Sequence, residues 1–216
     1  MQSESAQRRP FNPVVARLAY IGGKLFRVRL AVGLIVTLAG LELVRPTPFF
    51  GSRYRLIHAF ALVLIAAGLA LRAWGAGSAG SHTRSGVIEA ARLATGGAFA
   101  YVRNPIYLGS MWIGFGMAAL IGDPWAFLLA AVAFGILYFS IVPAEEEYLF
   151  RRFGQEYRRY RESVPRFIPR LRPFPGREQM PFAWRAVYGE LFMALFLTGI
   201  YIALLFEEYF DKIGRS

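Results

Sequence analysis

The chain has 216 residues, of which 56% are hydrophobic and only 18% charged, and its formal net charge is +11. Soluble domains carry about 25% charged residues, so this composition indicates a protein that lies in lipid. The absence of cysteine excludes disulfides and thiolate chemistry, and with His58 and His82 as the only imidazoles we expect no metal site.

Five apolar runs follow a polar and basic N-terminal stretch. Residues 1–29 show no short apolar core with a small-residue cleavage site, so we expect no cleavable signal peptide. A membrane-spanning helix needs about 20 apolar residues. We therefore predict an all-α, polytopic membrane protein with about five transmembrane helices, built on residues 30–44, 56–71, 106–121, 125–142 and 186–206.

The positions of the basic residues predict the orientation. The segments before the first run, between the second and third, and between the fourth and fifth hold 20 of the 25 Lys and Arg residues. Because positive charge favours the cytosolic side, the N-terminus and these three segments are expected there. A +11 charge would suggest nucleic acid in a soluble protein, but here the charges flank apolar runs, so anionic lipid headgroups are the expected partner.

Three local patterns add detail to this topology. Only residues 122–124 separate the third and fourth runs, which predicts a tight helical hairpin. Residues 75–101 are rich in Gly, Ser and Ala and predict a flexible connector with a short helix near residues 87–93. After the fourth run, an apolar stripe at helical spacing predicts one amphipathic helix on the bilayer surface, carrying Leu149, Phe153, Tyr157, Tyr160 and Val164.

The chain thus divides into four predicted segments. Residues 1–29 form a cytosolic N-terminal segment, and residues 30–74 form the first two transmembrane helices. Residues 75–184 form a core with the hairpin and the amphipathic segment, and residues 185–216 form the last transmembrane helix and a tail.

One polar stretch that could carry chemistry lies where the connector enters the third run. Asn104 is suited to cap a helix and Pro105 to occupy its first position. Tyr107 fits an interfacial aromatic belt. These local roles leave Arg103 unexplained, so this stretch is a candidate binding segment.

A second polar stretch follows Pro143 at the cytosolic end of the fourth run. Glu145, Glu146 and Glu147 repel one another and the anionic headgroups. They either pair with Arg151 and Arg152 or face a cationic or polyhydroxyl ligand, as ionisable groups at membrane depth often do.

Glu190 is a separate ionisable residue, in the last apolar run. A charge in lipid costs about 3 kcal/mol or more, so Glu190 needs a partner. We expect it to pair with Arg185.

The order of these motifs resembles the isoprenylcysteine carboxyl methyltransferase and phospholipid methyltransferase family. The resemblance covers about residues 97–169, through Gly97, Arg103-Asn104-Pro105-x-Tyr107-x-Gly109, Glu145-Glu146-x-x-Leu149, Phe153-Gly154-x-Glu156-Tyr157-x-x-Tyr160 and Val164-Pro165-Arg166-x-Ile168-Pro169. It implies S-adenosylmethionine as cofactor, bound at the cytosolic face, with Glu145, Glu146 and Arg103 as catalytic residues. It further implies cofactor contacts from Gly97, Tyr101, Arg103, Asn104, Pro105, Tyr107, Leu108, Gly109, Glu145 and Glu146. The implied reaction is methylation of a carboxyl oxygen or an amine nitrogen on a lipid or lipidated small molecule.

Two departures from the family pattern bear on the reaction. Many members have histidine where this chain has Asn104, so a proton-transfer role there is excluded, although asparagine still offers hydrogen bonds. Ser163 stands where the eukaryotic prenylcysteine enzymes have a basic residue, with Arg161 and Arg166 as possible substitutes. The methyl acceptor and the oligomeric state therefore stay open.

Two alternatives to this function are a sterol-reductase-like, nicotinamide-dependent enzyme and a structural membrane protein of the same fold without turnover. The chain has no dinucleotide glycine fingerprint, which opposes the reductase. Asn104 in place of histidine is the feature that favours the structural protein.

Overall fold

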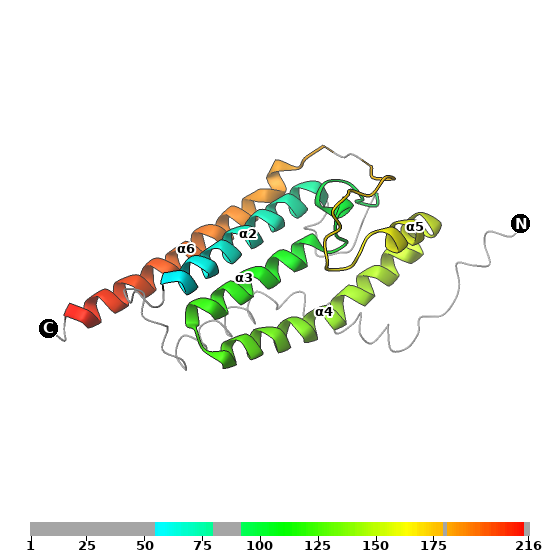
Figure 1. Ribbon diagram of the computed structural model, residues 1–216. Coiled ribbons are helices and arrows are strands. Elements are labelled where there is room, and N and C mark those ends of the chain that lie inside the picture. The colour runs from blue at the N-terminus through cyan, green and yellow to red at the C-terminus, as the bar shows by residue number, and fades with distance from the viewer. Residues whose placement is uncertain (1–54, 80–91, 179–180, 214–216) are drawn as a thin grey trace, which may run out of the picture.

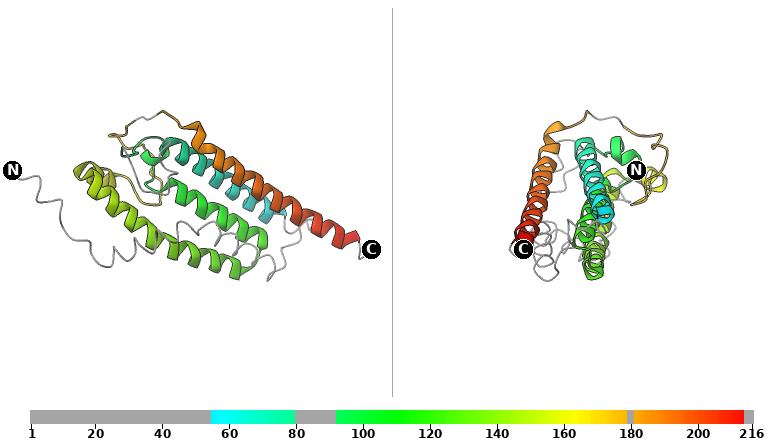
Figure 2. Two further views of the ribbon diagram at one scale, coloured as in Figure 1. Left: turned by 180° about the vertical axis from the view of Figure 1, so that it is seen from behind. Right: turned by 60° about the vertical axis from the view of Figure 1, so that its left-hand side comes forward.

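The computed structural model describes residues 55–79, 92–178 and 181–213, and within these ranges the chain is helical and contains no strand (Figure 1). Its elements are α2 (Arg55–Ala79), the 3-10 helix η3 (Gly97–Ala100), α3 (Pro105–Ile121), α4 (Pro124–Phe153), α5 (Gln155–Ser163) and α6 (Trp184–Ile213). The four long helices lie side by side in an elongated bundle, with α2 packed against both α3 and α6 (Figures 1 and 2). The predicted all-α class is confirmed.

Three of the described helices are long and apolar enough to cross a membrane: α2, α4 and residues Trp184–Ala203 of α6. The apolar helix α3 is shorter, at 17 residues. Four of the five predicted runs lie in these helices, while the run at residues 30–44 lies outside the described residues. Large apolar side chains such as Phe139 and Phe192 are 77% and 75% exposed, as expected for helices that contact lipid. The chain is a multi-pass membrane protein.

The predicted hairpin between α3 and α4 is confirmed. The Asp123 side chain caps α4 by accepting a hydrogen bond from the Trp125 backbone N–H at 2.7 Å. Pro124 occupies the first turn of α4, where its missing N–H costs nothing. Two residues, Gly122 and Asp123, therefore suffice to reverse the chain.

The prediction that a flexible connector begins at Gly75 is wrong, because α2 continues to Ala79. Residues 75–78 are buried, and the Gly77 carbonyl accepts a hydrogen bond from the Ala183 backbone N–H at 2.8 Å. Small residues here let neighbouring segments approach the helix closely. Of the short helix predicted near residues 87–93, Arg92 and Leu93 are described and are not helical. The rest of that prediction lies outside the described residues.

The amphipathic stripe lies on two helices instead of one. Gly154 ends α4 and precedes α5 with a φ of 54°, a conformation that favours glycine because it has no Cβ. Tyr157, Tyr160 and Val164 are at most 3% exposed and pack with Leu93, Phe99 and Phe174 of the same chain. The prediction that the stripe faces the bilayer is therefore wrong, because the protein itself covers it.

A buried ion pair joins α2 to α6. Arg72 donates to Glu190 from Nε at 2.7 Å and from Nη2 at 2.9 Å, and it also donates to the Ser110 hydroxyl of α3. The prediction that Glu190 pairs with Arg185 is wrong. Residues five positions apart on a helix point about 140° away from each other, so Arg185 and Glu190 face different sides of α6.

Glycines set the distance between α2 and α3. A Cβ on Gly68 would lie 2.6 Å from the Gly109 carbonyl oxygen, and a Cβ on Gly109 would lie 2.6 Å from the Gly68 carbonyl oxygen. Such contacts between backbones are typical of helix pairs in membranes. No hydrophobic effect drives helix association there, and small residues let the helices pack closely enough for van der Waals contact. The structure therefore gives Gly109 a packing role.

We predict that Gly68→Ala lowers the stability of the folded protein by about 1–3 kcal/mol, because the added methyl group forces α2 and α3 apart. Gly199→Ala on α6 is the matched control, since its Cβ would meet nothing within 4 Å. That substitution should be neutral or stabilise by up to about 1 kcal/mol, from helix propensity alone. Thermal unfolding in detergent measures both, and equal midpoints for the two variants would contradict the packing role.

Candidate active site

The helix ends at one end of the bundle bring the two predicted polar stretches together. Residues 97–104 lead from η3 into α3; η3 packs against α2, and Arg103 reaches Glu146 in the last third of α4. Gly97 has a φ of 53°, and a Cβ there would lie 2.0 Å from the Ser78 hydroxyl oxygen. Only glycine fits this turn, so the Gly97 of the sequence motif shapes the loop before Arg103.

Glu146 binds two arginines from different parts of the chain. Arg103 donates from Nη1 to Glu146 Oε1 at 2.8 Å. Arg166 donates from Nε to Oε1 at 2.9 Å and from Nη2 to Oε2 at 2.6 Å. The side chains of Arg103 and Glu146 are only 12% and 7% exposed, so this pair is shielded from water, whereas the Arg166 side chain is 36% exposed.

The three adjacent glutamates point in different directions, because successive residues of a helix are about 100° apart. Glu145 accepts a hydrogen bond from the Tyr107 hydroxyl of α3 at 2.6 Å. Glu146 is buried, and Glu147 pairs with Arg151 at 2.8 Å on the surface. The predicted repulsion is relieved because each carboxylate has its own partner. Of the pairings predicted for the cluster, that of Glu147 with Arg151 is confirmed.

The segment after α5 crosses over the loop that carries Arg103. We call residues 164–174 the strap. Its Pro165 carbonyl accepts from the Arg103 backbone N–H at 2.9 Å, and the Arg170 N–H donates to the Tyr101 carbonyl at 3.0 Å. The Phe174 N–H donates to the Ala100 carbonyl at 2.9 Å. The strap therefore fixes the backbone of residues 100–103.

Asn104 also contacts the strap, through its Nδ2, which donates to the Arg166 carbonyl oxygen at 3.2 Å. The sequence predicts Asn104 as a helix cap, and it does precede α3, but its side chain makes no capping hydrogen bond. Pro105 is the first residue of α3, as predicted.

Two buried tyrosines of α5 lie near Arg103 and Glu146. Burial raises the pKa of Tyr157 to about 12, and the negative charge of Glu146 acts in the same direction, while Arg103 opposes it. Burial also raises the pKa of Tyr160, whose hydroxyl donates to the Phe99 carbonyl at 2.8 Å. Both phenols stay protonated at neutral pH and supply hydroxyl groups, not charges.

The remaining predicted residues lie at the edge of this cluster. The ring of Tyr101 contacts Trp74, with centroids 5.6 Å apart. Leu108 is buried, at 6% exposure. Gly109 faces α2, where its Cβ position also lies 2.7 Å from Arg72 Cγ, so it takes part in the packing of α3 against α2.

Sequence reasoning missed the partnership of Arg166 with Glu146. Only the Val-Pro-Arg motif hinted at a role for this arginine. Tyr138 was also missed; its hydroxyl donates to the Tyr107 carbonyl at 2.7 Å, and its ring stacks on Phe167 with centroids 5.7 Å apart. It lies inside an apolar run, where nothing in the sequence separates it from lipid-facing aromatics.

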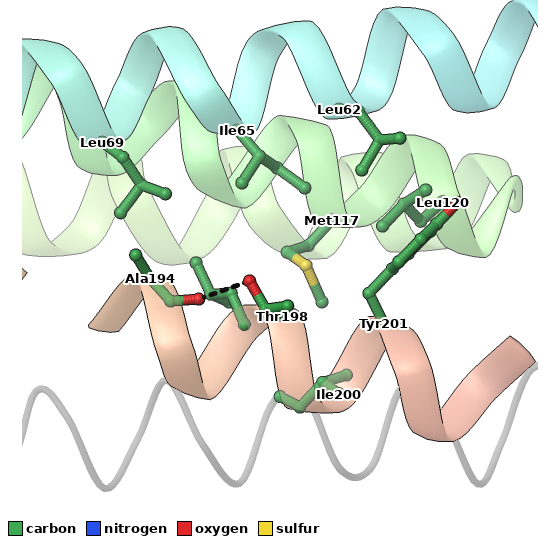
Figure 3. Close-up of a pocket in the computed structure, with 10 residues that line it drawn as sticks. Leu62, Ile65, Leu69, Met117, Leu120, Ala194, Thr198, Ile200 and Tyr201 are labelled. Atoms are coloured by element: carbon green, nitrogen blue, oxygen red, sulfur yellow. Dashed lines mark hydrogen bonds between the residues drawn. The ribbon is translucent and has the colours of Figure 1, made fainter. Parts of the chain in front are cut away.

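An apolar hollow of about 90 Å³ lies elsewhere, between α2, α3 and α6 (Figure 3). The hydroxyl of Thr198 at its edge donates to the Ala194 carbonyl of its own helix at 2.8 Å. No charged side chain belongs to this lining, which consists of Leu62, Ile65, Leu69, Met117, Leu120, Ala194, Leu197, Thr198, Ile200 and Tyr201. The charged cluster around Glu146 is therefore the candidate site.

Comparison with known proteins links this geometry to a family. The family of phospholipid methyltransferases matches residues 56–156. Protein-S-isoprenylcysteine O-methyltransferase of Schizosaccharomyces pombe is 36% identical over 77 residues, which cover 36% of this chain and 33% of that protein. The chain thus spans about a third of the length of this curated relative. No solved structure gives a significant match.

The fold and the site define a class: multi-pass, all-helical membrane proteins with a charged cluster at the shared end of their helices. Within that class, the chain is similar to the phospholipid methyltransferase family over residues 56–156 and to the isoprenylcysteine methyltransferase of S. pombe over 77 residues. The matched residues 56–156 include Arg103, Tyr107, Glu145 and Glu146.

We predict that Glu146→Gln destabilises the protein by about 3–5 kcal/mol, because Arg103 and Arg166 then lose the charge that neutralises them. Glu147→Gln is the control. Its pair with Arg151 is more than a third exposed, so the loss should stay below about 1 kcal/mol. Unfolding in detergent distinguishes the two, and similar losses would show that the Glu146 network does not hold the site together.

Proposed function

We propose that this chain is an S-adenosylmethionine-dependent membrane methyltransferase that acts on a lipid or lipidated small-molecule acceptor. The observation that carries the proposal is the convergence of Arg103 and Tyr107 with Glu145 and Glu146 at one end of the bundle. All four residues lie within the part of the chain that matches the family.

The donor set of the cluster fits S-adenosylmethionine. Arg103 Nε is buried and has no hydrogen-bond partner among the described residues, so this guanidinium retains a donor for an anionic group such as the methionine carboxylate. The carboxylates of Glu145 and Glu146 suit the ribose hydroxyls and the ammonium group. Tyr101 and Trp74 offer aromatic faces near the same loop for the adenine.

The residues of the site act mainly by binding and orientation. When bound, S-adenosylmethionine supplies a methyl group on a positively charged sulfur, which a nucleophile can take by in-line displacement. With the cofactor bound, Glu145 and Glu146 would supply negative charge to a positively charged ligand, and the buried pair of Arg103 and Glu146 would limit access of water. A carboxylate or a neutral amine as acceptor requires no further acid or base.

An ammonium acceptor would first have to lose a proton. Glu146 already accepts from two guanidinium groups, so Glu145, which accepts from the Tyr107 hydroxyl, is the better placed general base. Asn104 offers only an amide, which bonds the strap and cannot transfer a proton.

We further propose that this end of the bundle faces the cytosol and that the N-terminus lies on the same side. The ten arginines from Arg151 to Arg185 support this orientation. The acceptor would then enter sideways from the bilayer, while the water-soluble cofactor arrives from the cytosol.

We predict that the purified protein binds S-adenosylhomocysteine, and that Glu145→Gln and Arg103→Lys each weaken this binding about tenfold or more, since each removes a charged or bidentate partner. Isothermal titration calorimetry in a detergent that keeps the protein folded measures the affinities. Arg158→Gln, on the exposed face of α5, should bind like the unchanged chain. Equal affinities for all variants would remove the site assignment.

A catalytically silent protein of the same fold is the second candidate, favoured by one observation. Arg166 and Arg103 together occupy both oxygens of Glu146, which leaves this carboxylate engaged without any ligand. Incubation with cofactor labelled in its methyl group distinguishes the two: labelled lipid product supports the enzyme, and cofactor binding without any labelled product supports the silent protein.

A further inference from the structure

The strap exposes two large apolar side chains at the end of the bundle. Ile168 is 79% and Leu171 is 98% exposed, whereas Val164 in the same segment is 1% exposed. Phe167 and Arg166 face inwards, to Tyr138 and Glu146. An exposed apolar pair on a well-bonded segment indicates an interaction surface.

The depth of the strap follows from its contact with α4. Phe167 stacks on Tyr138, and the next residue of α4, Phe139, is 77% exposed within the apolar part of the helix. The apolar residues 125–142 span about 27 Å, which is close to the thickness of a bilayer core. Their far end begins with Trp125, which is 72% exposed. The strap therefore lies where the apolar part of α4 ends.

The start of α6 indicates the same boundary of the apolar layer. Trp184 and Tyr188 are 72% and 65% exposed there, and such aromatic residues gather at the boundary between headgroups and acyl chains. The backbone hydrogen bond from Ala183 to Gly77 ties this region to the end of α2.

The charge of the strap indicates what it contacts. Arg170 and Arg172 flank Leu171, and residues 163–177 contain no Asp or Glu. The Arg170 guanidinium lies at the surface, where Nη1 donates to the Ser163 carbonyl at 2.9 Å, and Arg172 is exposed. Apolar side chains between arginines at this depth fit a leaflet that contains anionic phospholipid.

We propose that the strap is a membrane anchor: Ile168 and Leu171 insert at the boundary between headgroups and acyl chains, and Arg170 and Arg172 bind phosphates of anionic phospholipids. The apolar stripe of α4 and α5, which the sequence assigns to this role, is covered by the protein. The anchor also supports the loop of the candidate site, because the strap binds the backbone of Tyr101 and Arg103.

The chain has no cysteine, so a single introduced cysteine carries a unique fluorescent label. We would place a nitrobenzoxadiazole label at Ile168→Cys and at Leu171→Cys, in vesicles of equal parts phosphatidylcholine and phosphatidylglycerol. Phe139→Cys serves as the lipid-facing control. Gln155→Cys, exposed beyond the end of α4, serves as the water-facing control.

We expect lipids with a spin label near the headgroup to quench the labels at 168 and 171 almost as strongly as the label at 139, and at least about twofold more than the label at 155. Quenching by spin-labelled phosphatidylglycerol should exceed that by spin-labelled phosphatidylcholine, and Arg170→Gln with Arg172→Gln should abolish this preference. Quenching at 168 and 171 no greater than at 155 would overturn the anchor. Self-quenching that grows with protein density would instead assign the surface to a second copy of the chain. Neither readout depends on methyl transfer.

Discussion

The carboxylate of Glu146 is the interaction on which the candidate site depends. It lies on α4 and binds Arg103 from the loop before α3 and Arg166 from the strap, three segments that are far apart in the sequence. A buried carboxylate without a countercharge costs several kcal/mol. The arrangement in which Arg103 and Arg166 both reach Glu146 is therefore the favoured arrangement of the three segments. Tyr107, Glu145 and Asn104 take their positions from this arrangement, because each bonds a residue next to or within the network.

Much of this arrangement is predictable from local sequence patterns. Apolar runs of near-spanning length identify α2, α3, α4 and α6, and Asp123 with Pro124 identifies the hairpin. The polar residues Arg103 and Glu146 stand out because charges near a membrane need an explanation. The partners that a residue finds far away in the sequence are not predictable in this way. Nothing local shows that Glu190 pairs with Arg72 and not with Arg185, because that choice depends on which faces of α2 and α6 meet.

The stripe from Leu149 to Val164 shows the same limit. Its period of three to four residues predicts a helix with an apolar face, but the period does not say what covers that face. The positive φ of Gly154 breaks the helix, and Leu93, Phe99 and Phe174 cover the stripe from distant positions in the chain. The exposed apolar residues of the strap, Ile168 and Leu171, have no period at all. Their exposure is visible only in three dimensions.

The bond between Arg72 and Glu190 has a consequence for where the folding unit ends. Arg72 lies within the residues that match the family, while Glu190 lies beyond them on α6. Without α6, the Arg72 guanidinium would lose the countercharge that the described residues give it, and it would cost more free energy to keep α2 in lipid. The last helix is therefore an integral part of the domain, which makes the cooperative structure longer than its recognisable family signature.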